Sequence, residues 1–158
     1  MMVLRWAKLK YGDVAEFTYE EIKSILGCLE DGTPLENVER LNEHARIRKH
    51  VYRPQFRYSW ATGTTFIWEE IGERRPVIAY VLRKHLDSSL IHAVVITGHS
   101  DDRTTIYIND PLDDRASEVP TGRFIHEWEL LYRTVARVMI VESRDTRISD
   151  FEDGNDER

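Results

Sequence analysis

The stretch IHAVVITGHSDDRTTIYINDP, residues 91–111, constrains the fold more than any other part of the chain. Two apolar, β-branched runs flank a polar, turn-forming centre, and this pattern predicts a β-hairpin. Side chains two residues apart point to the same face of a strand, so His92 shares a face with Val94. By the same rule Asp110 shares a face with Ile108. Each strand therefore carries an ionisable group at the open end of an apolar face.

We expect His92 and Asp110 to meet across this hairpin. An odd number of residues in the loop pairs His92 directly with Asp110, on one face of the sheet. Facing Cβ atoms then lie about 4.5–5.5 Å apart, which brings the carboxylate within hydrogen-bonding reach of the imidazole. An even loop would place the two side chains on opposite faces.

Two interpretations of this pair stay open at this point. A carboxylate that orients a histidine is part of a nucleophile–base–orienter relay, in which the free imidazole nitrogen takes a proton from the nucleophile. Alternatively, His92 is a satisfied polar group at the start of a strand, and Asp110 binds a backbone amide at a turn before Pro111.

Capping patterns predict two helices in the first third of the chain. In FTYEEIKSILGC, Thr18 caps the helix, Glu21 completes a capping box and Gly27 ends the helix. In DGTPLENVERLNEHAR, Thr33 is expected as the cap, Pro34 as the first helical residue and Glu36 as the partner in a second capping box. One face of this second helix is apolar, through Leu35, Val38, Leu41 and Ala45.

The remaining elements predict an α+β fold in which helices pack on a mostly antiparallel sheet. Helices are expected at 64–75 and 122–133, and strands at 47–53, 76–83 and 135–143 in addition to the hairpin. We place one domain at 1–143 and expect the acidic segment 144–158 to be a flexible tail.

Composition excludes some classes of protein. No apolar run reaches the roughly 20 residues of a membrane-spanning helix, so no membrane span is expected. The net charge of −6 argues mildly against nucleic acid as a partner. One cysteine, Cys28, cannot form an internal disulfide, which makes the cytoplasm the expected compartment.

The order of motifs along residues 2–141 resembles the papain-like cysteine peptidases of the bacteriocin-processing (double-glycine leader peptidase) type. The stretch HAVVITGHSDDRTTIYINDP resembles that family's histidine and aspartate region. EDGTPLENVERLNEHAR, ERRPVIAYV and FIHEW resemble other family motifs in the same order. The resemblance implies a papain-like fold, a peptide or protein segment as partner, no cofactor, His92 as general base and Asp110 as its orienter.

The family's nucleophilic cysteine and oxyanion-hole glutamine belong to a box that ends in MVL, here residues 2–4. Counting back along that box places both residues before Met1, so neither is in this sequence. Cys28 is an unlikely substitute, because it follows Gly27 at the end of a predicted helix, and a reactive thiol needs a helix N-terminus or an imidazolium beside it.

Two further groups of residues are candidate sites. His92, Asp110, Asp113 and Asp114 resemble a divalent-metal cluster only loosely, because their spacing matches no metal motif, and we predict no metal. The aromatic stretch 52–60 is of the kind that lines a peptide groove or stacks on bases, but an edge strand that packs aromatic rings on a helix is the favoured interpretation.

Two functional hypotheses follow. In the first, the chain is a cysteine-peptidase domain that binds an extended peptide beside His92 and needs an N-terminal extension for proteolysis. In the second, the same fold is a non-catalytic module that binds a protein segment. The coding sequence upstream of Met1 distinguishes the two hypotheses.

Overall fold

The computed structural model describes residues 2–28, 32–85, 88–111 and 116–142. Its helices are α1 (Met2–Tyr11), α2 (Tyr19–Leu26), the 3₁₀ helix η1 (Leu35–Glu43), α3 (Ala45–Arg48), α4 (Thr65–Gly72) and α5 (Thr121–Glu129). Its strands are β1 (Tyr52–Trp60), β2 (Val77–His85), β3 (Ser88–His99), β4 (Thr105–Asn109), β5 (Ser117–Pro120) and β6 (Thr134–Glu142). The predicted tail 144–158 lies outside the described residues.

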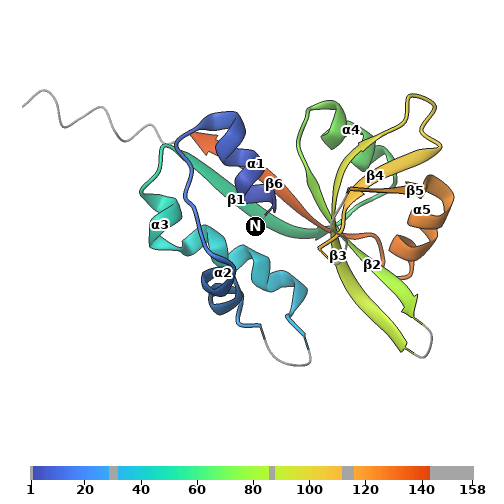
Figure 1. Ribbon diagram of the computed structural model, residues 1–158, viewed down its shortest axis with the longest axis horizontal. Coiled ribbons are helices and arrows are strands. Elements are labelled where there is room, and N and C mark those ends of the chain that lie inside the picture. The colour runs from blue at the N-terminus through green and yellow to red at the C-terminus, as the bar shows by residue number, and fades with distance from the viewer. Residues whose placement is uncertain (1, 29–31, 86–87, 112–115, 143–158) are drawn as a thin grey trace, which may run out of the picture.

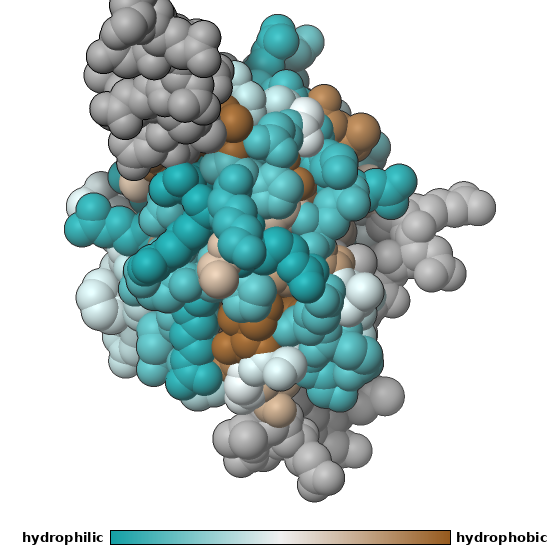
Figure 2. All heavy atoms as spheres, turned by 90° about the vertical axis from the view of Figure 1, so that its left-hand side faces the viewer, coloured by the Kyte–Doolittle hydropathy of each residue, from teal (hydrophilic) through white to brown (hydrophobic). Residues whose placement is uncertain are grey.

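The strands form one sheet in the order β1-β6-β2-β3-β4-β5, and each pair of neighbours is antiparallel. Helices α1, α2 and α3 gather at one end of the molecule, and α4 and α5 lie at the other (Figure 1). Seen from the side of α1–α3, polar side chains cover most of the surface and leave only a small apolar area (Figure 2). The predicted α+β class, with helices on an antiparallel sheet, is confirmed.

The first predicted capping box is confirmed in α2. Thr18 accepts a hydrogen bond from the backbone N–H of Glu21, and the Glu21 carboxylate accepts one from the backbone N–H of Thr18. Gly27 ends the helix with φ +64°, a left-handed conformation that glycine adopts without steric cost.

The second capping box is wrong. Pro34 rather than Thr33 is the cap residue, no side chain caps the helix, and η1 is a 3₁₀ helix instead of an α-helix. The apolar spacing gives a physical reason, because Leu35, Val38 and Leu41 recur at intervals of three residues. Side chains three apart eclipse one another in a 3₁₀ helix, so this spacing points a single narrow apolar ridge at the core.

The strand predicted at 47–53 is also wrong in its first half. Residues 45–48 form the short helix α3, whose N-cap residue His44 accepts a hydrogen bond from the backbone N–H of Arg46 through Nδ1. Ile47, a residue of this helix, is fully buried. The strand begins only at Tyr52, because the local cap and the burial of Ile47 outweigh the β-propensity of the segment.

The edge strand β1 is shielded by side chains of η1. The Asn42 amide donates to the Phe56 carbonyl and accepts from the Phe56 N–H, both at 2.7 Å. The Glu39 carboxylate accepts from the Tyr58 N–H at 2.7 Å. These side chains take the hydrogen bonds that another strand would otherwise make, which protects an exposed edge from further pairing.

Two buried clusters divide the core, and we name them by the helix that covers each. The η1 face comprises Val3, Leu4, Ala15, Ile22, Val38, Leu41, Ile47, Phe56, Tyr80, Val95, Ala136 and Val138. The α5 face comprises Ile67, Val77, Ala79, Val81, Val94, Ile96, Ile106, Ile108, Val119, Phe124, Trp128 and Val135. Adjacent residues such as Val94 and Val95 fall on opposite faces, as the alternation of side chains along a strand requires.

No helix in the described part of the chain is both long enough and apolar enough to cross a membrane.

Candidate active site

The hairpin of β3 and β4 brings His92 and Asp110 to one face, but by a different register from the one predicted. Near the turn Gly98 pairs with Tyr107, whereas beyond Thr97 the pairing is Ile96 with Ile108. A β-bulge at Thr97 therefore separates two registers. If the pairing of Ile96 with Ile108 is continued along the strands, Asp110 lies across from Val94, two residues from His92. The predicted direct pairing of His92 with Asp110 is therefore wrong.

The bulge determines whether His92 and Asp110 lie on the same face of the sheet. Between the bonded residues Ser100 and Thr105 the turn has an even number of residues, and an even loop by itself would put His92 and Asp110 on opposite faces. The extra residue, Thr97, shifts the register by one and restores the shared face. Diagonal neighbours on one face are close enough for long side chains to meet.

The two side chains form a short hydrogen bond. His92 Nε2 lies 2.5 Å from Asp110 Oδ1. The Asp110 side chain is fully buried, and the His92 side chain keeps 14% of its exposure. A buried carboxylate requires a polar partner, which His92 supplies, while the imidazole still reaches solvent.

This geometry assigns the two ring nitrogens to different tasks. Because Nε2 is bonded to Asp110, Nδ1 is the nitrogen left to exchange a proton with another group. The short β4 strand and the packed α5 face hold Asp110 in place, since Ile106 and Ile108 precede it on the same side and are fully buried. A fixed acceptor behind a partly exposed imidazole can orient the ring.

The remaining candidate residues are Cys28, Asp113 and Asp114. Cys28 directly follows the C-cap Gly27 of α2, and its backbone N–H donates to the Lys23 carbonyl. Asp113 and Asp114 lie outside the described residues. Within residues 2–28, 32–85, 88–111 and 116–142 there is no group of three or more His, Cys, Asp or Glu side chains that could hold a metal ion.

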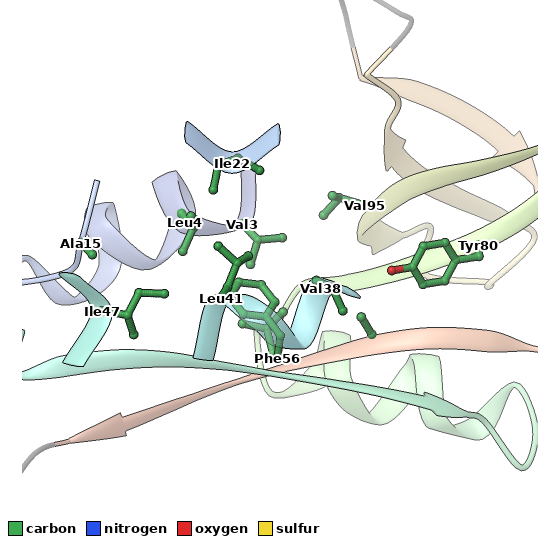
Figure 3. Close-up of a cluster of buried hydrophobic side chains, with 12 residues drawn as sticks. Val3, Leu4, Ala15, Ile22, Val38, Leu41, Ile47, Phe56, Tyr80 and Val95 are labelled. Carbon is green, nitrogen blue, oxygen red and sulfur yellow. The ribbon is translucent and has the colours of Figure 1, made fainter. Parts of the chain in front are cut away.

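A cavity of about 420 Å³ lies on the η1 face, and we call it the η1 cavity. Figure 3 shows the side chains of this face, with Val95 and Tyr80 set apart from those around Leu41. The cavity is lined by Met2, Val3, Leu4, Ile22, Leu26, Thr33, Pro34, Leu35, Val38, Leu41, Phe56, Ile78, Tyr80, Ile91, Ala93, Val95 and Pro111. Sequence reasoning missed it, because its wall comes from segments that only the tertiary fold brings together.

Tyr80 connects the sheet to η1 at this cavity. Its hydroxyl donates to the Leu35 carbonyl at 3.3 Å, and burial raises the pKa of the hydroxyl above its ordinary value. Of the aromatic stretch 52–60, Phe56 lines the cavity, whereas the Trp60 side chain is exposed at the end of β1. The prediction that this stretch is an edge strand is confirmed, whereas the choice between packing on a helix and lining a groove stays open, because Phe56 does line a cavity.

An antiparallel sheet covered by helices, with a histidine and a buried aspartate paired at one hairpin, fits the α+β, papain-like class of cysteine peptidases. The model of the family described as Peptidase_C39 like matches residues 9–136, most of the sequence. The chain belongs to this family.

One solved structure is that of a protein from Bacillus anthracis named a C39-like peptidase. It matches with 17% sequence identity and a TM-score of 0.46, over 56% of this chain and 52% of that one. The chain thus spans about half the length of that protein. No curated protein matches the chain.

Proposed function

We propose that this chain is a papain-like cysteine-peptidase domain that binds an extended peptide beside His92, with His92 as general base and Asp110 as its orienter. The observation that carries the proposal is the 2.5 Å contact between His92 Nε2 and the fully buried Asp110 carboxylate. In the proposed step Nδ1 takes the proton of a thiol, and the thiolate attacks the peptide carbonyl.

The thiol is not that of Cys28 in this proposal. Cys28 lies beyond the C-terminal end of α2, whereas a reactive thiol needs a helix N-terminus or an imidazolium beside it. The first turn of α1, with Met2 and Val3, instead lines the same cavity as Ile91 and Ala93, which flank His92. A nucleophile placed upstream on α1, as the resemblance to the family implies, would approach the strand of His92 from the η1 face. It would have to reach the imidazole around the edge of β3 from Ser88 to Val94, with which no strand among the described residues pairs.

The alternative is a binding module that keeps the fold without a nucleophile. The observation that favours it is that Cys28 is the one cysteine of this sequence. The coding sequence upstream of Met1 separates the two functions. An in-frame extension that encodes a glutamine and a CG-x-A box supports the enzyme, whereas a stop codon directly upstream supports the module.

Thiol labelling tests the relay itself. We expect the chain as printed to react with a thiol-directed peptide probe no faster than free cysteine. Adding a CG-x-A turn in helical continuity with α1 should create labelling that His92→Ala slows about 100-fold or more, because a general base contributes at least that much.

Three control variants make the labelling experiment decisive. Cys28→Ala should leave the labelling of the extended chain unchanged. Asp110→Asn should retain more of the reactivity than Asp110→Ala, since an amide oxygen still accepts a hydrogen bond from Nε2–H. Labelling or peptide cleavage by the unextended chain that Cys28→Ala abolishes would overturn this assignment.

The narrower assignments stay predictions. They are the bacteriocin-processing type, with its double-glycine leader peptides, and residence in the cytoplasm. The first is tested by cleavage of a peptide that contains two consecutive glycines, using the extended chain.

A further inference from the structure

A second cavity, of about 690 Å³, lies among α1, residues 15–18, α2 and α3, and we call it the α1 cavity. These three helices gather at one end of the molecule (Figure 1). The wall on α1 is formed by Leu4, Arg5, Lys8 and Leu9, whose spacing places them on one face of the helix. Leu4 also lines the η1 cavity, but the other lining residues of the two cavities differ.

The inner part of the α1 cavity is apolar. Leu4 and Ala15 are buried, with 6% and 1% exposure, and Phe17 is half-buried. Leu9, on the same helix face as Leu4, keeps 81% exposure. A ligand that covers these side chains removes apolar surface from water, which is favourable in proportion to the area covered. The α1 cavity therefore favours a ligand that has an aliphatic part.

The charged side chains that line the α1 cavity are paired, with one exception. Lys8 Nζ lies 2.9 Å from Glu16 Oε1. Arg46 Nη2 lies 2.7 Å from Glu21 Oε1. Arg5 is exposed and has no ion pair with any carboxylate in the described part of the chain. A free guanidinium presents a planar set of donors that matches a carboxylate, so the lining favours one anionic group at Arg5.

The wall opposite α1 is held in place by its own contacts. Arg46 Nη1 donates to the Glu16 carbonyl at 2.8 Å, and its guanidinium lies 4.9 Å from the centre of the Phe17 ring. The capping box of Thr18 and Glu21 fixes the start of α2 at the same wall. A site that is formed before its ligand arrives loses less conformational entropy on binding.

We propose that the α1 cavity binds a small aliphatic carboxylate, with its carboxylate on the Arg5 guanidinium and its hydrocarbon chain on Leu9 and Phe17. Arg5 and Leu9 lie four residues apart on α1, so one ligand reaches both side chains. The volume of about 690 Å³ lies within the range of small-molecule sites, about 300–1,000 Å³. This inference goes beyond the proposed function and does not depend on it, because it involves neither His92 nor Asp110.

Titration of the full 158-residue chain with free aliphatic carboxylates tests the site. The probes are hexanoate, octanoate, decanoate and the uncharged decanol, each kept below the concentration at which it forms micelles and followed by backbone amide shifts. Affinity should rise about threefold for each methylene group that the cavity buries. Decanoate should bind about fivefold or more tightly than decanol, because only the carboxylate pairs with Arg5. The largest shifts should fall on Arg5, Leu9 and Phe17.

Two substitutions separate the head group from the chain of the ligand. Arg5→Gln should weaken decanoate binding about fivefold and leave decanol binding unchanged, because glutamine keeps the length but not the charge. Leu9→Ser should weaken the binding of both probes, and the fold should tolerate it because Leu9 is exposed. Arg57→Gln is the matched control, since it removes an exposed arginine of β1 that does not line the cavity. It should bind like the unmodified chain.

Three results would overturn the proposal. Equal affinity for decanoate and decanol would show that Arg5 does not hold the head group. Shifts centred on Tyr80 and Val95 would place the probe in the η1 cavity instead. Binding to phosphatidylglycerol vesicles without binding to free decanoate would identify a membrane surface in place of a free carboxylate.

Discussion

The two faces of the sheet differ in how completely they are packed. On the α5 face nine of the twelve core side chains, among them Ile96, Ile108 and Trp128, show no exposure. On the η1 face Ile22, Val38 and Val95 keep 8–9% exposure and surround a cavity. The face that fixes Asp110 is dense, and the opposite face contains a cavity. Dense packing holds buried side chains in one geometry, whereas an unfilled apolar space leaves its lining side chains room to move.

Trp128→Ala should give the largest effect, because it empties the centre of the α5 face. The ring is fully buried, and its Nε1–H donates to the Thr134 carbonyl at 2.9 Å. We expect a loss of about 3–5 kcal/mol in the free energy of unfolding, measured by urea denaturation. Trp128→Phe, which keeps an aromatic ring, should cost clearly less. A loss below about 1 kcal/mol for the alanine variant would contradict the dense packing of this face.

Val94→Ala and Val95→Ala compare the two faces at neighbouring positions of one strand. Both variants remove the same two methyl groups, but Val94 is fully buried on the α5 face and Val95 lines the η1 cavity. We expect losses of about 2–3 kcal/mol for Val94→Ala and about 1–1.5 kcal/mol for Val95→Ala, since Val94 leaves a new void and Val95 only enlarges one that exists. Equal losses would remove the distinction between the faces.

Glu70→Gln should give a smaller effect that depends on pH. The Glu70 side chain of α4 is 3% exposed and accepts hydrogen bonds from Arg75 Nε at 2.8 Å and Arg137 Nη2 at 2.5 Å. Burial raises the pKa of the Glu70 carboxyl, but the bonds to the two arginines outweigh burial and lower it below the ordinary 4.5. We expect a loss of about 1–2 kcal/mol at pH 7, because both guanidinium groups remain partly in water.

The sign of the pH dependence follows from the lowered pKa of Glu70. The stabilisation is fully present above pH 4.5 and is lost as the pH falls toward the pKa of the folded state. The stability difference between the unmodified chain and Glu70→Gln should therefore shrink below pH 4.5. Thermal unfolding of both proteins between pH 7 and pH 3 measures this difference, and a constant gap would show that ionised Glu70 contributes no more than glutamine.

Local patterns in the sequence determined several parts of this protein. The capping box of Thr18 and Glu21 and the left-handed Gly27 involve atoms a few residues apart, so the sequence alone predicts where α2 begins and ends. The alternation of His92 with Val94, and of Asp110 with Ile108, likewise placed each side chain on the apolar face of its own strand.

Only the tertiary structure decided how those parts meet. The bulge at Thr97 sets the register that joins His92 to Asp110, and the pairing of the two strands shows where it lies. The contacts of η1 with β1, through Asn42 and Glu39, join residues that lie 14 and 19 positions apart in the sequence. The η1 cavity arises where α1, α2, η1 and three strands come together, so it is a property of long-range packing that no local pattern encodes.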